Sequence, residues 1–431
     1  MLLLYFPGNE VMAMTEFPYP RHDVLCLDMR SFYASVECMK RGLDPAKALL
    51  AVVGDPERSG SIVLAASPAL KERHGTGNVS RFFELPDDPE IIIAKACMQD
   101  YLDVSVEITR LVHQYAPREA IHVYSIDELW VTVDGLEKLY GPPREVAELF
   151  RKRIAEQFGI ECAVGIGDNK FLAKVVLDIH AKKSADGIAV CRYEDVERLL
   201  WPVPVEDIWG IGKRMMRRLN NMGIIKLGDL ATHPLRFLKK RFGVMGEQLY
   251  WHARGVDLSP VFGNFTGAVQ KSYGHGITLL EDYDEKDIYP CLLDLCEEVC
   301  RRAREFHHIG RTVHLGLGYT KGTGGGFSRS LTLHTPTNLT MDMYRAILSL
   351  FRKHYDRGLA IRRVYVSLTN LENDESLQMT FFDRKEKERD LAVTMDDIRA
   401  RYGSTSLLRA SSYEPGGITI ERSKKVGGHY A

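Results

Sequence analysis

Short apolar runs of strand length alternate with helical patterns through the first part of the chain. Residues 23–28, 129–133 and 161–167 are rich in β-branched and other apolar residues and predict buried strands. Apolar positions recur at helical spacing in residues 100–115 and 144–158. The pattern predicts an α+β domain in which helices lie between antiparallel strands.

A smaller group of elements interrupts this pattern. Residues 48–53 and 62–66 predict two short strands on either side of a polar turn. Residues 68–73 predict a short helix, for which Ser67 is the expected N-cap and Pro68 lies in the first turn.

The second part of the chain has a different pattern. Residues 207–243 predict helices joined by glycine-containing turns. Residues 258–269 predict a linker, and residues 371–431 are polar and charged enough to predict a tail with little core. The segments between linker and tail alternate in the order β-α-β-β-α-β of a split βαβ unit, and they span residues 271–280, 286–306, 311–319, 327–333, 339–355 and 361–368.

The composition is that of an ordinary globular protein. Its 431 residues suggest about two to four domains, and 45% hydrophobic and 27% charged residues are usual values. No apolar run approaches the ~20 residues that cross a bilayer, so we expect no membrane association. The eight cysteines form no C-x-x-C pair, which favours a reducing, cytoplasmic environment.

The net charge of −1 argues against a nucleic-acid-binding protein, but its distribution argues for one. Residues 188–258 contain 12 Lys and Arg against 8 Asp and Glu. Residues 259–370 contain 14 against 11. Positive charge is therefore concentrated in two middle regions, where it is available for phosphate contacts.

Two acidic segments, about a hundred residues apart, carry the candidate chemistry. Asp28 ends the first predicted strand, and Asp127 and Glu128 lie in the turn before the strand at 129–133. Carboxylates at the edge of a rigid sheet can form a hard oxygen site for two Mg²⁺ ions. Such a site supports in-line attack of a hydroxyl group on a phosphoryl group.

Three segments in this order resemble the bacterial Y-family DNA polymerases of the UmuC and DinB type: residues 28–33, 125–128 and 164–174. The resemblance extends from about residue 23 to about residue 371 and leaves the choice between the two branches open. It implies a right-hand polymerase with a palm, fingers, a helix-hairpin-helix thumb and a β-α-β-β-α-β little finger. The expected domains are an N-terminal extension (1–20), palm (21–40 and 96–187), fingers (41–95), thumb (188–258), little finger (264–370) and C-terminal tail (371–431).

The resemblance also implies the ligands of two Mg²⁺ ions. Asp28 and Asp127 are expected to bridge both ions, and Glu128 to complete the site nearest the primer 3′ hydroxyl. The backbone carbonyl of Met29 is expected to be a further oxygen ligand. These residues make the chain a predicted DNA-directed DNA polymerase, that is, a nucleotidyltransferase.

Several residues are expected to contact the incoming dNTP. By resemblance Tyr33 is the steric gate against ribonucleotides, and Phe32 beside it is the weaker candidate because packing explains it better. Lys170 opens a predicted helix, where a lysine and a helix N-terminus together attract a triphosphate.

The fingers match the family less well. The family often uses a Tyr and an Arg three residues apart to bind the triphosphate, but Ala69 and Glu72 fall on these positions here. Lys71 or Arg73 is the expected substitute, and the sequence does not choose between them. The missing tyrosine favours the UmuC branch.

Primer-template DNA is expected to contact two regions. Gly210, Gly212 and Lys213 resemble a helix-hairpin-helix turn, in which backbone amides approach phosphates without reading sequence. On the little finger the expected contacts are Lys271, Ser272 and Arg329.

The segment containing Gln378, Phe381 and Phe382 resembles the short peptide with which bacterial polymerases bind the sliding clamp (β subunit). Exposed aromatic residues in a polar tail are suited to docking on a partner. The alternative is a minor strand that closes the little finger.

The expected function is error-prone translesion synthesis by a monomer in DNA repair and an SOS-type damage response. A nucleotidyl cyclase also carries paired acids on a palm-like sheet, but it needs no duplex-binding thumb or little finger. A non-catalytic DNA-binding or clamp-recruited scaffold would not need Asp28, Asp127 and Glu128 together. Primer extension with and without Mg²⁺ distinguishes the three.

Overall fold

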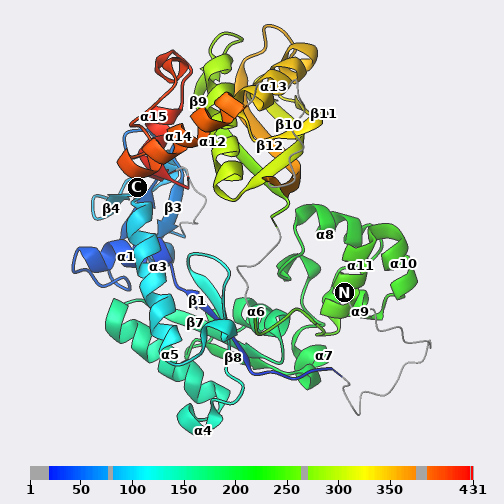
Figure 1. Ribbon diagram of the computed structural model, residues 1–431. Helices are drawn as coiled ribbons and strands as arrows, with labels where there is room; N and C mark the ends of the chain where they lie inside the picture. Colours follow the sequence, from blue (N-terminus) through cyan, green and yellow to red (C-terminus); the bar gives the residue numbers. More distant parts are fainter. Residues whose placement is uncertain (1–18, 76–80, 264–269, 375–385, 428, 431) are drawn as a thin grey trace. The chain divides into compact units, whose positions relative to one another are not determined.

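In the computed structural model the chain divides into two compact units, residues 1–266 and 267–431 (Figure 1). The structure describes residues 19–75, 81–263, 270–374, 386–427 and 429–430. The predicted N-terminal extension, apart from residues 19 and 20, and the predicted clamp peptide lie outside the described residues. Among the helices that the structure describes, none is both long and apolar enough for a membrane span.

The first unit is built around a five-stranded sheet in the order β5-β6-β1-β7-β8. The three predicted strands are confirmed as β1, β6 and β7. The strands are β1 (Val24–Met29), β5 (Ile121–Val123), β6 (Glu128–Thr132), β7 (Cys162–Gly167) and β8 (Ile188–Cys191).

Strand β8 corrects the predicted boundary between palm and thumb at residue 187. It pairs in parallel with β7, with Val164 opposite Ile188 and Gly167 opposite Cys191, and therefore belongs to the same sheet. A parallel pair needs a crossover connection, which α6 (Lys170–Ile179) provides. The sequence alone did not show that the short apolar run after this crossover returns to the sheet.

The two faces of the sheet pack against different helices. Leu25 and Leu27 belong to a core shared with α1 (Phe32–Lys40), α3 (Met98–His113) and α5 (Pro143–Phe158). Val24 and Cys26 pack on α6 instead. Because side chains alternate along a strand, Asp28 lies on the same face as Cys26, toward α6.

Two glycines allow α6 to lie close to this face. A Cβ atom at Gly165 would be 2.0 Å from the carbonyl oxygen of Ala173, and one at Gly167 would be 2.5 Å from the Ala173 nitrogen. Both distances are too short for any side chain, so the Gly-Ile-Gly sequence of β7 is a packing requirement. It sets the distance between α6 and β1.

A separate three-stranded sheet, ordered β3-β2-β4, forms the predicted fingers region. It contains β2 (Leu50–Val53), β3 (Val63–Ala66) and β4 (Ile92–Lys95), with helix α2 (Pro68–His74) after β3. The Ser67 hydroxyl accepts a hydrogen bond from the Leu70 amide at 3.3 Å, which confirms the predicted N-cap.

Small helices follow β8 and share their own apolar core. The chain then returns to the main sheet, where Val261 is buried beside Trp130 and its carbonyl accepts a hydrogen bond from Thr132 at 2.9 Å. Residues 258–263 are therefore anchored, which corrects the predicted linker. The helices are α7 (Val196–Leu199), α8 (Lys213–Asn220), α9 (Leu227–Thr232), α10 (Leu235–Phe242) and α11 (Val244–Ala253).

The second unit confirms the predicted β-α-β-β-α-β order. Its sheet has the order β11-β10-β12-β9, and α12 and α13 contribute the apolar core on one face. The elements are β9 (Ser272–Tyr283), α12 (Ile288–Glu305), β10 (His308–Tyr319), β11 (Gly326–Thr337), α13 (Thr340–His354) and β12 (Ile361–Asn373).

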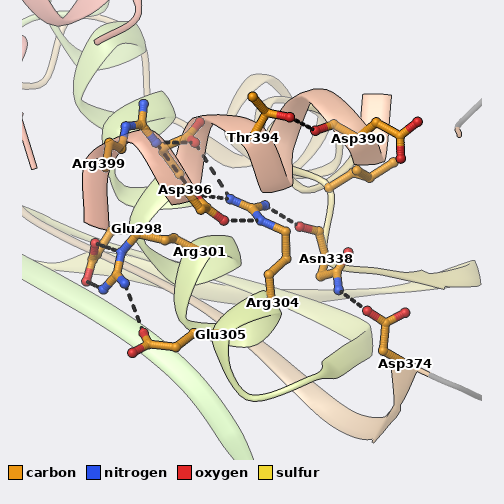
Figure 2. Close-up of polar contacts among 12 residues, drawn as sticks. Glu298, Arg301, Arg304, Glu305, Asn338, Asp374, Asp390, Thr394, Asp396 and Arg399 are labelled. Atoms are coloured by element: carbon orange, nitrogen blue, oxygen red, sulfur yellow. Dashed lines mark hydrogen bonds and ion pairs between the residues drawn. The ribbon is translucent and has the colours of Figure 1, made fainter. Parts of the chain in front are cut away.

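The C-terminal segment corrects the prediction of a tail with little core. It forms α14 (Glu386–Tyr402), α15 (Thr419–Ser423) and a short β13–β14 pair (Lys425–Val426 and His429–Tyr430), and Ile418 joins the core of the second unit. Helix α14 docks through charges, as Figure 2 shows: Arg304 of α12 binds Asp396 at 2.6 Å. Low apolar content was a misleading signal because ion pairs replace the apolar stripe.

Candidate active site

The site is centred on three carboxylates at one end of the main sheet. Asp28 of β1 and Glu128 of β6 are direct register partners, so their side chains project side by side from the same face. Asp178 of α6 meets them there. The candidate ligand oxygens of the three residues all lie within 4.8 Å of one another, a spacing that a hard divalent cation can bridge.

Two lysines neutralise these carboxylates. The Lys182 ammonium donates to Asp28 at 2.7 Å and to Asp178 at 2.9 Å. The Lys174 ammonium donates to Glu128, and to Asp178 at 3.1 Å. The cluster therefore holds three formal negative charges and two positive ones.

Burial determines the electrostatics of the cluster. Burial and the hydrogen bond shared with Glu128 raise the pKa of Asp28 to about 7, although the Lys182 charge opposes this. Burial acts to lower the pKa of Lys182, but Asp28 and Asp178 together outweigh it and the pKa is raised. The lysines thus stay charged, whereas the Asp28 carboxyl, with a pKa of about 7, is only partly ionised at neutral pH. A bound cation would favour its ionised form, so the site is suited to accept one.

Asp127 is not among the three carboxylates that the described residues bring together. Its carboxylate accepts a hydrogen bond from the Ser125 hydroxyl at 2.7 Å, and its carbonyl accepts one from the Met29 amide at 2.9 Å. Asp127 lines a small cavity on the α3 side of the sheet. Glu128 lines the same cavity. Asp127 lies in the bend directly before β6, next to Glu128 but outside the group of three carboxylates.

Tyr33 and Phe32 have different environments. The Tyr33 ring stacks on Tyr101, with centroids 4.6 Å apart and planes at 19°. Its pKa is raised by burial and, to a smaller extent, by the Asp127 charge. Phe32 is 3% exposed and lies in the core. Only Tyr33 is accessible enough to touch a substrate.

The structure distinguishes Lys71 from Arg73. The Lys71 ammonium donates to the Ser31 hydroxyl at 3.0 Å, three residues beyond Asp28. Burial lowers the pKa of Lys71, and the Asp28 charge partly offsets this. Arg73 is instead ion-paired with Asp88, at 3.4 Å, and with Glu90.

Lys170 lies one turn before Lys174 on α6 and is directed elsewhere. Its ammonium is 3.0 Å from Nδ1 of His122 and 6.0 Å from the ring centroid of Trp130. Burial lowers its pKa to about 8. The lysines that reach the acidic cluster are instead Lys174 and Lys182.

Asp178 and Lys182 were not predicted as site residues, and Lys174 was only the weaker neighbour of Lys170. A signal was present: Lys170, Lys174, Asp178 and Lys182 are spaced four residues apart. Spacing of four keeps residues on one face of a helix. In the structure eight of the ten residues of α6 are buried. Charged side chains on such a helix need partners of opposite charge nearby.

The predicted DNA contacts lie on exposed surface. Gly210 has φ 91°, a conformation that favours glycine, and a Cβ atom at Gly212 would meet nothing within 4 Å. Both lie directly before Lys213, the exposed first residue of α8. The turn is therefore open to a phosphate backbone.

On the second unit, Ser272 pairs with Thr369 of β12 at the start of β9, and Lys271 precedes it. Arg329 of the edge strand β11 pairs with the buried Leu315. Ser272 therefore points to the sheet face opposite the one that α12 and α13 cover, whereas Arg329 points to the helix side at the sheet edge.

Comparisons with known proteins identify the family. Residues 27–178 match the model of the impB/mucB/samB family, residues 270–381 match the C-terminal domain of that family, and residues 193–224 match its HHH motif. The chain is similar to the "Putative UV-damage repair protein UvrX" of Bacillus subtilis (strain 168), with 48% identity over 415 residues that cover 95% of this chain and 98% of the relative.

A "DNA polymerase IV 2" of the same organism is 40% identical over 411 residues, which cover 94% of this chain and 98% of the relative. Among solved structures, a Y-family DNA polymerase chimera of Dbh and Dpo4 has a TM-score of 0.64 and 24% identity. That match covers 81% of this chain and 98% of the other, and shows a shared fold. The chain therefore belongs to the impB/mucB/samB family, the Y-family DNA polymerases of the UmuC and DinB type.

Proposed function

We propose that this Y-family DNA polymerase performs template-directed translesion synthesis in DNA repair, with Asp28 and Glu128 as the core of its catalytic site. The observation that carries the assignment is the register of β1 and β6. It holds two carboxylates side by side, with Asp178 within 4.8 Å, at the end of a rigid sheet. Lys174 and Lys182 offset only two of the three negative charges, so the arrangement still favours a bound cation.

The donor set fits Mg²⁺, because all candidate ligands are hard carboxylate oxygens. Two bound Mg²⁺ ions would lower the pKa of the primer 3′ hydroxyl and neutralise charge on the dNTP triphosphate. Asp28 and Glu128 would hold these ions together with Asp127 and the Met29 carbonyl. The bend at 125–127 would then bring the Asp127 carboxylate to the site as a further ligand.

We assign the nucleotide contacts from the positions of the side chains. Tyr33, on which the Asp127 charge acts, is the proposed steric gate, with Tyr101 stacked behind it. Lys71 is the proposed triphosphate contact from the fingers, since it is held next to the strand that carries Asp28. Ion pairs with Asp88 and Glu90 make Arg73 a structural residue.

The elements then take the parts of a polymerase hand. The five-stranded sheet, including β8, is the proposed palm, the β3-β2-β4 sheet the fingers, helices α8–α11 the thumb, and residues 270–374 the core of the little finger. DNA would contact the Gly210–Lys213 turn and the polar face of the second sheet. The segment with Gln378, Phe381 and Phe382 remains a proposed sliding-clamp peptide.

The experiment is primer extension on a plain and a lesion-containing template, with and without Mg²⁺. Asp28→Asn and Asp127→Asn are expected to abolish nucleotide addition and to leave primer-template binding intact, because DNA is held by other elements. Extension by either variant at the wild-type rate would remove that residue from the catalytic site. Extension without any divalent cation would refute the metal mechanism.

Tyr33→Ala tests the gate in the same assay. Opening the space below the sugar is expected to reduce the preference for dCTP over CTP by about 100-fold, the discrimination that a single steric contact with a hydroxyl supplies. The measurement is the ratio of the two kcat/KM values. An unchanged ratio would assign Tyr33 to packing against Tyr101.

A further inference from the structure

Asp178 connects the two halves of the acidic cluster through a single oxygen. Its Oδ1 atom accepts hydrogen bonds from Lys174, one turn before it, and from Lys182, one turn after it. Each lysine also reaches one of the proposed metal ligands: Lys174 reaches Glu128, and Lys182 reaches Asp28. Asp178 thus holds one ammonium against each ligand carboxylate.

These ammonium groups contact carboxylate oxygens of the two proposed metal ligands. The Lys182 nitrogen is 2.7 Å from Asp28 Oδ2, and the Lys174 nitrogen is 3.9 Å from the same atom. A carboxylate oxygen that accepts a short bond from an ammonium cannot also take a metal at full strength. Metal entry therefore requires the lysines to withdraw from Asp28 and Glu128.

The two lysines differ in their freedom to withdraw. The Lys174 side chain is 4% exposed, whereas the Lys182 side chain is 36% exposed. Lys182 also sits outside α6, in the turn of residues 181–183. Asp178, 27% exposed, remains as an acceptor for both when their other partners bind a cation.

We propose that Asp178 is a positioning residue for metal binding: Lys174 and Lys182 act as internal counter-ions that the metals displace, and Asp178 retains both lysines beside the site. This inference rests on the proposed metal site. It assigns Asp178 an indirect role in metal binding. It also implies that a metal ion must compete with Lys182 in order to bind the free protein.

The test is Mn²⁺ binding to the full-length protein without DNA or nucleotide, followed by electron paramagnetic resonance of the free ion. Lys182→Met is expected to tighten Mn²⁺ binding about three- to tenfold, because one competing ammonium is gone. The matched control is Lys183→Met, which removes an exposed positive charge from the adjacent position and is expected to change the affinity less than twofold. Equal effects of the two variants, or weaker Mn²⁺ binding by Lys182→Met, would refute the proposed displacement of Lys182 by the metal ion.

Asp178→Asn separates positioning from direct ligation. Without Asp178 the lysines stay on Asp28 and Glu128, so Mn²⁺ binding is expected to weaken. This loss of affinity is expected to be smaller when Asp178→Asn is introduced into the Lys182→Met variant. The same loss in both backgrounds would make Asp178 a ligand and would refute the positioning role. If the wild-type protein binds no Mn²⁺, the proposed metal site itself fails, which is a distinct outcome.

Discussion

The palm cluster and the cluster that docks α14 are both partly buried groups of five charges, but their balance is opposite. In the palm, three acids face two lysines: Asp28, Glu128 and Asp178 with Lys174 and Lys182. In the second unit, two acids face three arginines: Glu297 and Asp396 with Arg304, Arg399 and Arg409. The first cluster has a net charge of −1 and the second of +1.

The pKa values show what this difference means. Burial and Glu128 raise the pKa of Asp28 to about 7 despite Lys182. Burial also acts to raise the pKa of Glu297, but Arg409 and Arg399 outweigh it and the pKa is lowered. The arginine cluster therefore stabilises the fold, whereas the palm cluster keeps an unfavourable charge arrangement that a bound cation relieves.

Asp28→Asn gives the largest contrast between the two clusters. We expect kcat to fall by about 10³-fold or more, because a charged metal ligand is lost. We also expect the first unit to gain about 1–4 kcal/mol in free energy of unfolding at pH 8, since the Asp28 pKa is higher in the folded state than the ordinary 3.8. The gain should shrink as the pH falls from 7 toward 4, where Asp28 takes up its proton in the folded state.

Tryptophan fluorescence measures this gain, because all four tryptophans lie in the first unit. A loss of stability in Asp28→Asn at pH 8 would show that the palm cluster stabilises the fold, as the arginine cluster does. It would contradict the proposed difference between the two clusters.

Arg304→Met tests the opposite cluster. The Arg304 side chain is 6% exposed, binds Asp396 at 2.6 Å and donates to the Asn338 carbonyl at 2.7 Å. Among the described residues, its loss leaves the Asp396 carboxylate with only the longer contact to Arg399 at 3.8 Å, and we expect the second unit to lose about 3–5 kcal/mol. Far-ultraviolet circular dichroism should report this loss while tryptophan fluorescence remains unchanged.

The control is Arg345→Met on α13. Arg345 pairs with Asp342 at 3.3 Å, but its side chain is 64% exposed. We expect a change within about 0.5 kcal/mol. A similar small effect for Arg304→Met would mean that α14 docks by other contacts.

Lys71→Ala examines a charge next to the palm cluster. If Lys71 binds the triphosphate, its removal should raise the KM for dNTP about tenfold, the usual effect of losing one charge-assisted hydrogen bond. Arg73→Ala is the matched control two residues away, and its KM should stay within twofold because Arg73 pairs with Asp88 and Glu90. A larger rise in KM for Arg73→Ala than for Lys71→Ala would make Arg73 the triphosphate contact in place of Lys71.

Glu297→Gln has the smallest expected effect and concerns pH. Because the folded-state pKa of Glu297 is lowered, its stabilisation is present above 4.5 and is lost as the pH falls through the folded value. We expect the second unit of the wild-type protein to lose stability below pH 4.5 that the variant does not lose. Parallel pH curves for the two proteins would exclude Glu297 as the source.

Local patterns predicted much of the architecture. The order of strands and helices, the Ser67 cap and the β-α-β-β-α-β unit follow from periodicity and capping, which depend on neighbours in the sequence. The misplaced boundary at β8 and the docked α14 depend on distant partners. A four-residue strand needs β7 beside it, and a polar helix needs buried charges on α12, and no local signal reports either.

The sequence by itself determined that Asp28 and Glu128 are acids at strand ends and that Lys174, Asp178 and Lys182 share a helical spacing of four. Tertiary structure decided which of these groups meet. Strand pairing placed Asp28 opposite Glu128, and the glycines of β7 brought α6 close enough for Asp178 to join them. Asp127 stayed outside this group because it lies in the bend before β6, and the β1–β6 register pairs Asp28 with Glu128 and not with Asp127.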